Sequence, residues 1–67
     1  MSVVKIIELI GTSKESWEDA AEAAVKKASK TIHNITGVEV IAQTANVKNG
    51  GIVEYKTTVH LAFGLDE

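Results

Sequence analysis

The sequence predicts a small α+β fold, a β-α-β-β subunit in which one helix packs on a three-stranded antiparallel sheet. One stretch has apolar residues at three- and four-residue spacing, and the runs on either side of it are rich in β-branched residues. With 67 residues and no cysteine, the chain has no length for a second core and no disulfides. We therefore expect residues 1–67 to form a single domain that gains its missing stability by assembling as a homo-oligomer.

The first strand is expected from about Val3 to Ile10, a run that two charged residues interrupt. Because one helix covers only one face of a sheet, apolar residues on both faces of this strand indicate a partner chain. The segment Gly11-Thr12-Ser13 is expected to end the strand. Ser13 is then expected to cap the helix by accepting a hydrogen bond from the Ser16 amide.

The helix is expected from Lys14 to about His33, with one buried stripe along it. The stripe consists of Trp17, Ala21, Ala24, Val25, Ala28 and Ile32. Its alanines let the helix axis lie close to the sheet, and Trp17 is expected to be core rather than a ligand platform. Acidic residues fill the first half of the helix and lysines the second, which suits the helix dipole and predicts a solvated outer face.

Two further strands, Val38 to Val47 and Ile52 to Leu65, flank an Asn49-Gly50 pair, which is a strong hairpin signal. A turn centred on this pair fixes the register of the hairpin. On the helix-facing side this register pairs Val38 with Leu61, Val40 with Val59 and Thr44 with Tyr55. On the other side it pairs Glu39 with His60, Ile41 with Thr58 and Gln43 with Lys56. A right-handed crossover makes the first two strands parallel, so the third lies between them, antiparallel to both, in the order 1-3-2.

Charge and hydropathy exclude several classes of partner. The net charge is −2 and every basic residue is a lysine, so the basic face and the arginine fork typical of nucleic-acid binding are missing. The apolar run at the N-terminus is too short to span a membrane and has the wrong pattern for a signal peptide. We expect neither nucleic acid nor membrane as a partner, and a cytoplasmic location.

The predicted pairing of Glu39 with His60, near Gln43 and Lys56, is the one constellation that resembles acid–base machinery. Such cross-strand pairs are ordinary sheet partners, and no nucleophile motif, metal-ligand cluster or phosphate loop accompanies them. We assign no catalytic residue and do not expect an enzyme.

Several short segments, in order and at matching spacing, together resemble the dodecin family over nearly the whole chain. They are Lys5-Ile6-Ile7-Glu8, Gly11-Thr12-Ser13, Ser16-Trp17, Ala28-Ser29-Lys30-Thr31, Asn34, Val38-Glu39-Val40 and Phe63-Gly64-Leu65. The resemblance implies a hollow homododecamer of β-α-β-β subunits that holds flavins such as riboflavin or FMN in stacked pairs at subunit interfaces. It implies a store or quencher of a small molecule, not a catalyst.

Two positions depart from the pattern of the flavin-binding members. The resemblance places an aromatic residue, usually tryptophan, at the position of Gly37, and a glutamine at the position of Lys56. Glycine offers no stacking surface, and lysine only donates hydrogen bonds, whereas an amide also accepts them. Gly37 and Lys56, with Gln43 near Lys56, therefore mark the expected pocket while weakening the case for flavin.

The alternative is a calcium-binding or purely structural shell. A second branch of the family, described as calcium-binding, also lacks the tryptophan and has a basic residue after the strand tyrosine, and this sequence is similar to that branch at Gly37 and Lys56. Calcium takes six to eight oxygen ligands, and a symmetric shell repeats one or two carboxylates around an axis. Glu39 and Glu54 are the candidates, together with the terminal Asp66 and Glu67. No calcium-loop spacing is present, and each of these carboxylates is better explained on its own as a solvated or salt-bridged surface group.

Overall fold

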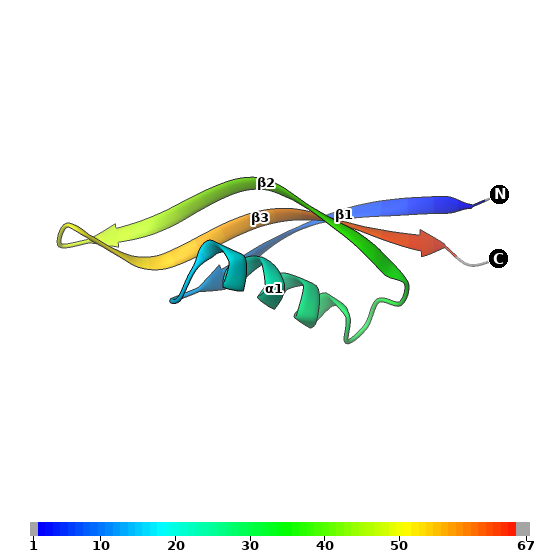
Figure 1. Ribbon diagram of the computed structural model, residues 1–67, viewed down its shortest axis with the longest axis horizontal. Helices are drawn as coiled ribbons and strands as arrows, with labels where there is room; N and C mark the ends of the chain where they lie inside the picture. Colours follow the sequence, from blue (N-terminus) through cyan, green and yellow to red (C-terminus); the bar gives the residue numbers. More distant parts are fainter. Residues whose placement is uncertain (1, 66–67) are drawn as a thin grey trace.

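The structure is a computed structural model that describes residues 2–65. Its four elements are β1 (Val3–Ser13), α1 (Trp17–Ala28), β2 (Ile35–Lys48) and β3 (Gly51–Leu65). The strands form one sheet in the order β1-β3-β2, with β3 antiparallel to both neighbours. Helix α1 lies along one face of the sheet, and the β2–β3 hairpin extends far beyond it at one end (Figure 1). The predicted α+β architecture and strand order are confirmed.

Strand β1 does not end at Gly11 as predicted, but continues to Ser13. A Cβ atom at Gly11 would overlap the carbonyl oxygen of Ala20 and would approach the Cβ of Ala24 to 3.2 Å. Glycine is present because helix and strand backbones touch here, not because the strand breaks. The prediction that Gly11-Thr12-Ser13 ends the strand is therefore wrong.

Helix α1 is shorter than predicted at both ends, spanning Trp17–Ala28. The side chain of Ser16 caps it by accepting from the Asp19 amide at 3.0 Å. Beyond Ala28 the chain leaves the helix through tighter i→i−3 bonds, among them the Thr31 amide to the Ala28 carbonyl at 3.1 Å. Asn34 then adopts a left-handed φ of 64° and leads into β2.

Ser13 shapes the turn before the helix rather than capping it. Its hydroxyl accepts from the amides of Glu15 at 2.8 Å and Ser16 at 3.4 Å and donates to the Asp19 carboxylate at 2.7 Å. The expected contact with the Ser16 amide is present, but the capping role falls to Ser16 itself.

The core lies between the alanine stripe of α1 and the middle of β3. Its buried apolar residues are Ala20, Ala24, Ala28, Val59 and Leu61, and Ile7, Leu9, Ala21, Val25, Ile32 and Ile35 pack around it. The predicted stripe is thus confirmed, with Ala20 as the member that the spacing argument missed. Small side chains on the helix and larger ones on the sheet allow the two backbones to approach closely.

Trp17 anchors the start of α1 to the hairpin. Its ring meets that of Tyr55 edge-on, with centroids 4.8 Å apart and planes at 80°. The indole nitrogen donates to the Thr44 carbonyl at 2.8 Å, and the buried hydroxyl of Thr57 donates to the Trp17 carbonyl at 2.8 Å. Trp17 is therefore a packing residue, as expected.

The hairpin register is as predicted near the middle of the sheet and near the turn. Val38 opposes Leu61, Glu39 opposes His60 and Val40 opposes Val59, and the turn has positive φ angles at Asn49 (54°) and Gly50 (80°). Between these regions a bulge leaves Ile41 without a partner, and a second irregularity near Val53 restores the register. The intervening segment is displaced by one residue.

This one-residue displacement overturns three predicted pairs. Thr44 opposes Lys56 instead of Tyr55, and Gln43 opposes Thr57 instead of Lys56. The predicted pair of Ile41 with Thr58 is also wrong, since Ala42 opposes Thr58. A one-residue slip moves side chains of β2 to the other face, so Gln43 lies on the helix-facing side, whereas Lys56 is on the uncovered side as predicted.

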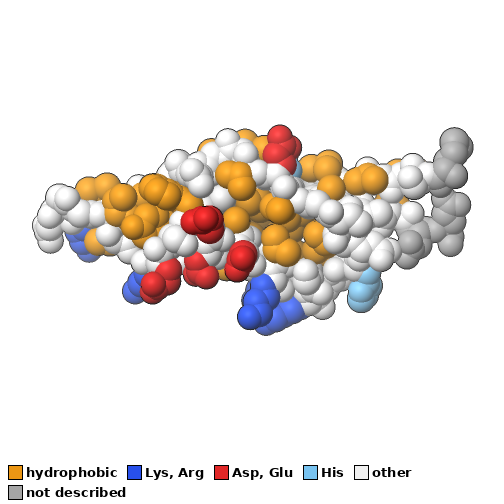
Figure 2. Space-filling model, viewed as in Figure 1, with side chains coloured by type: hydrophobic (Ala, Val, Ile, Leu, Met, Phe, Trp, Pro, Cys, Tyr) orange, Lys and Arg blue, Asp and Glu red, His pale blue; other side chains and the backbone are white. Residues whose placement is uncertain are grey.

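The isolated chain leaves an unusually large surface in solvent, and many large apolar side chains lie on it. Its accessible area is 4932 Å², against about 4,100 Å² for a compact protein of this mass. Exposed large apolar residues are Val3, Val4, Ile6, Ile10, Val38, Val40, Ile41, Val47, Ile52, Val53 and Leu65. Apolar side chains gather in patches along the length of the molecule (Figure 2), which measures 52 × 20 × 12 Å. No helix within residues 2–65 is long and apolar enough to cross a membrane.

Substituting Gly11 by alanine should destabilise the protein by about 3 kcal/mol, because α1 must move away from β1 to admit a methyl group. The matched control is Gly64→Ala, since a Cβ there meets nothing within 4 Å. Thermal unfolding followed by circular dichroism compares the two variants. Equal melting temperatures would contradict the close-approach role of Gly11.

Candidate ligand site

The uncovered face of the sheet carries a shallow pocket of about 250 Å³. Its lining residues are Ile6, Gly37, Val38, Glu39, His60 and Ala62. Two neighbouring rows of cross-strand partners build most of it. The first row runs across the sheet from Ile6 through Ala62 to Gly37, and the second from Glu8 through His60 to Glu39.

The first row is apolar and hollow, because two of its three side chains are small. A Cβ atom at Gly37 would meet the Cβ of Ala62 at 3.8 Å, which is ordinary van der Waals contact. Gly37 therefore occupies a position that the backbone leaves open to a larger side chain. The apolar floor is suited to a flat, apolar group of a ligand.

The second row is polar, with one residue from each strand. The Nε2 atom of His60 lies 2.8 Å from Oε1 of Glu8, and its Nδ1 lies 3.9 Å from Oε1 of Glu39. The imidazole is 33% exposed, while Glu8 and Glu39 are 61% and 74% exposed. The predicted Glu39–His60 pair is confirmed. Glu8 was missed, because no short turn joins β1 to β3 and their register cannot be derived from the sequence.

Lys56 and Gln43 do not join this pocket within one chain. Lys56 lies six residues from Ala62 along β3, a separation of about 20 Å, between Thr12 and Thr44 of the flanking strands. Gln43 lies on the helix-facing side, opposite Thr57. Of the three predicted pocket positions, only Gly37 lines the cavity.

The predicted cation ligands are also separated. Glu39 belongs to the polar row, whereas Glu54 lies near the hairpin tip, where its Oε1 accepts a hydrogen bond from the side-chain Nδ2 of Asn46 at 3.2 Å. Asp66 and Glu67 lie outside the described residues. Within residues 2–65 no group of three or more His, Cys, Asp or Glu side chains is placed to hold a metal ion.

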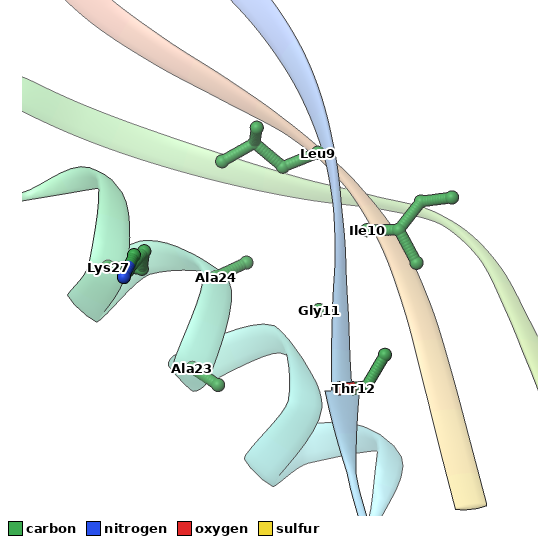
Figure 3. A pocket seen from close by; sticks show the side chains of 7 residues that line it. All are labelled: Leu9, Ile10, Gly11, Thr12, Ala23, Ala24 and Lys27. Carbon is green, nitrogen blue, oxygen red and sulfur yellow. The ribbon is translucent and has the colours of Figure 1, made fainter.

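A larger groove of about 350 Å³ runs between β1 and α1. It is lined by Leu9, Ile10, Gly11, Thr12, Ala23, Ala24 and Lys27. Leu9 points toward the helix and the side chain of Ile10 points away from it (Figure 3). Only Lys27 brings a charge to this lining, so the groove lacks the converging polar groups of a ligand site and is typical of a packing surface.

Both the sequence and the fold match those of a known group of proteins. Comparison with protein families matches dodecin over residues 3–66. The chain belongs to the dodecin family. It is 40% identical over 63 residues to the calcium dodecin of Mycobacterium tuberculosis, covering 94% of this chain and 89% of that one. It is 35% identical over 65 residues to the dodecin of Thermus thermophilus, covering 97% and 94%.

Solved structures of dodecins share the whole architecture. The crystal structure of an arginine-to-alanine variant of the Thermus thermophilus dodecin superposes with a TM-score of 0.95 at 34% identity, covering 100% of both chains. The calcium dodecin of Mycobacterium tuberculosis, described as calcium chelating with a novel calcium-binding site, gives 0.84 at 37% identity, covering 97% and 93%. The β-α-β-β arrangement described above is therefore the fold of dodecins.

Proposed function

We propose that this chain is the subunit of a dodecin-type shell, a homododecamer, that binds and stores a small ligand at its subunit interfaces rather than catalysing a reaction. The observation that carries the proposal is the apolar surface that the chain leaves uncovered. Side chains such as Ile10 (61% exposed) and Val47 (67% exposed) lie on parts of the sheet that α1 does not reach. Symmetric assembly buries such faces and the unpaired edges of β1 and β2 together.

The pocket beside Gly37 is the proposed ligand position. Gly37 and Lys56 are about 20 Å apart along the sheet of one chain, so one cavity can include both only if they come from neighbouring subunits. The shallow, half-apolar form of the pocket supports this arrangement, since a second chain would close it.

Flavin, as riboflavin or FMN, is the first ligand hypothesis. The apolar row of Ile6, Ala62 and Gly37 offers a flat floor for an aromatic ring system. In this chain the stacking partner expected of flavin-binding dodecins is absent, because Gly37 presents no ring, and Lys56 cannot accept from the flavin imide. The pocket is therefore suited to a planar ligand but lacks the groups that would hold flavin tightly.

Calcium is the second hypothesis, favoured by the 40% identity to the calcium dodecin of Mycobacterium tuberculosis. The candidate ligands Glu39 and Glu54 are exposed or half-exposed and separated in one chain. A calcium site built from them requires carboxylates of several subunits, with water completing six to eight oxygens.

Placing an aspartate at Ile10 should break the assembly, because burying an unpaired charge at an interface costs several kcal/mol per subunit. The control is Lys26→Asp, a charge change on the solvated face of α1. Size-exclusion chromatography with light scattering should give about 86 kDa for the unmodified protein and the control, twelve copies of 7.2 kDa, and much less for Ile10→Asp. A monomeric mass for the unmodified protein would contradict the proposal.

Restoring the aromatic and amide groups should create tight flavin binding. We expect the double variant Gly37→Trp and Lys56→Gln to bind riboflavin and FMN at least 100-fold more tightly than the unmodified protein, as measured by quenching of flavin fluorescence. The physical reason is that the variant provides a ring for stacking and an amide that accepts a hydrogen bond. A Cβ atom at position 37 meets only ordinary van der Waals contact, so the variant should keep the native fold. An unchanged circular dichroism spectrum is the control for this. Equally tight quenching by the unmodified protein would show that Gly37 and Lys56 do not impair the site.

Calcium binding should appear as stabilisation that magnesium does not reproduce. At 100 times its dissociation constant, a ligand adds about 2.7 kcal/mol per site, so 10 mM calcium should raise the melting temperature of the assembled protein if it binds at submillimolar concentration. Glu39→Gln and Glu54→Gln should reduce the effect, with Glu22→Gln on the solvated helix face as control. The same rise with magnesium, or in the Glu39 and Glu54 variants, would contradict a calcium site at these residues.

A further inference from the structure

We propose that Glu8 and His60 form half of a binding site for a late transition-metal dication, with Zn²⁺ as the representative ion. The same two residues of a second copy of the chain would complete the site across a twofold axis. The inference rests on the proposed assembly, because one chain supplies only two ligand atoms. It concerns a different donor set from the calcium hypothesis, since it depends on an imidazole nitrogen.

The two donor atoms already converge. His60 Nε2 and Glu8 Oε1 are 2.8 Å apart. In a tetrahedral zinc site with bonds of about 2.0–2.2 Å, adjacent nitrogen and oxygen ligands lie roughly 3.3 Å apart. A shift of about 0.5 Å would therefore admit the ion between them. The Glu8 side chain is 61% exposed, so its carboxylate is free to make this small movement.

Glu39 is placed to orient the imidazole rather than to bind the ion. Its Oε1 lies 3.9 Å from His60 Nδ1, on the far side of the ring from Glu8. In the metal-free protein Nε2–H donates the 2.8 Å hydrogen bond to Glu8, so the ion replaces this proton, which is released to solvent. By closing about 1 Å, Glu39 would then accept a hydrogen bond from Nδ1–H and hold the tautomer whose Nε2 lone pair binds the ion. A carboxylate is one of the usual hydrogen-bond partners of a metal-binding histidine, along with a backbone carbonyl or water.

The charge balance of this face also favours a cation. The carboxylates of Glu8 and Glu39 face a single imidazole. The other cross-strand neighbours of His60 on this face are uncharged. These are Ile6, Ile10, Gly37, Ala42, Thr58 and Ala62. Lys56, the lysine of β3 on this face, is four residues away, a separation of about 13 Å. Once this face is buried against another chain, the uncompensated carboxylates would be costly, and a dication between them removes much of that cost.

Exposed apolar side chains on either side of Glu8 indicate that a second copy of the chain covers the polar row. Ile6 and Ile10, on either side of Glu8 in β1, are 53% and 61% exposed on the same face. A symmetric contact over these residues brings two Glu8–His60 pairs together and supplies two nitrogens and two oxygens, a complete tetrahedral set. Imidazole donors select Zn²⁺, Co²⁺ or Ni²⁺ over Ca²⁺, which prefers oxygen ligands alone.

The test titrates the assembled, EDTA-treated and buffer-exchanged protein with Zn²⁺ by calorimetry and with Co²⁺ by visible absorption. We expect one ion per two chains and the intense bands of tetrahedral Co²⁺. His60→Asn and Glu8→Gln should each weaken binding at least 100-fold, and Glu39→Gln about 10- to 100-fold, as for other carboxylates that orient a metal ligand. His33→Asn is the matched control, because His33 is exposed and lies between α1 and β2, outside the cross-strand rows.

Light scattering on the metal-free samples separates the two proposals. A monomeric unmodified protein would overturn both the assembly and the shared site. An assembled protein that binds no Zn²⁺, binds one ion per chain, or keeps its affinity in His60→Asn would overturn the metal site alone. Displacement of Co²⁺ by equimolar Ca²⁺ would do the same, since it would show that the imidazole is not a ligand.

Discussion

One geometric constraint underlies the whole structure: a single helix of 12 residues must cover a sheet whose longest strand has 15. Small side chains bring α1 into contact with the sheet, and this contact buries the middle of β3 almost completely. The helix is about 18 Å long, whereas β3 spans roughly 50 Å. One complete face of the sheet and both ends of the other therefore have no cover within the chain.

The same constraint explains where the site lies. Because α1 occupies one face, the cross-strand rows on the opposite face are free to combine side chains from all three strands. His60 is on the central strand, so it meets Glu8 from β1 and Glu39 from β2. The neighbouring row contains Ala62 and Gly37, whose small size hollows the surface beside the imidazole. Under the proposed function another chain covers this pocket, which links ligand binding to assembly.

Local patterns in the sequence predicted most of the fold. The helical stripe, the Asn49-Gly50 turn and the sense of the crossover were sufficient for the strand order and for the Glu39–His60 pair. Two features could not be predicted, because no residue type or spacing in the sequence marks them: the bulge in β2 and the register between β1 and β3. The bulge at Ile41 involves no glycine, yet it transfers Gln43 to the helix-facing side. The partnership of Glu8 with His60 depends on the pairing of strands separated by about 50 residues, for which no turn fixes the register.

Gly11 and Gly37 show how differently the same residue type must be interpreted. At Gly11 the helix backbone excludes any side chain, so the residue is a packing requirement. At Gly37 the backbone leaves room, so glycine there is a property of the pocket and not of the fold. The family resemblance identified the second position, and the structure gave the reason why the first cannot change.

The central claim is that this chain is stable only as part of a symmetric assembly. The most direct test is equilibrium urea unfolding at subunit concentrations that span 100-fold, followed by circular dichroism and by light scattering on the same samples. The account predicts that helix signal and assembly are lost together and that the midpoint rises with concentration, because unfolding is then linked to dissociation. A folded monomer with a midpoint that does not depend on concentration would contradict it.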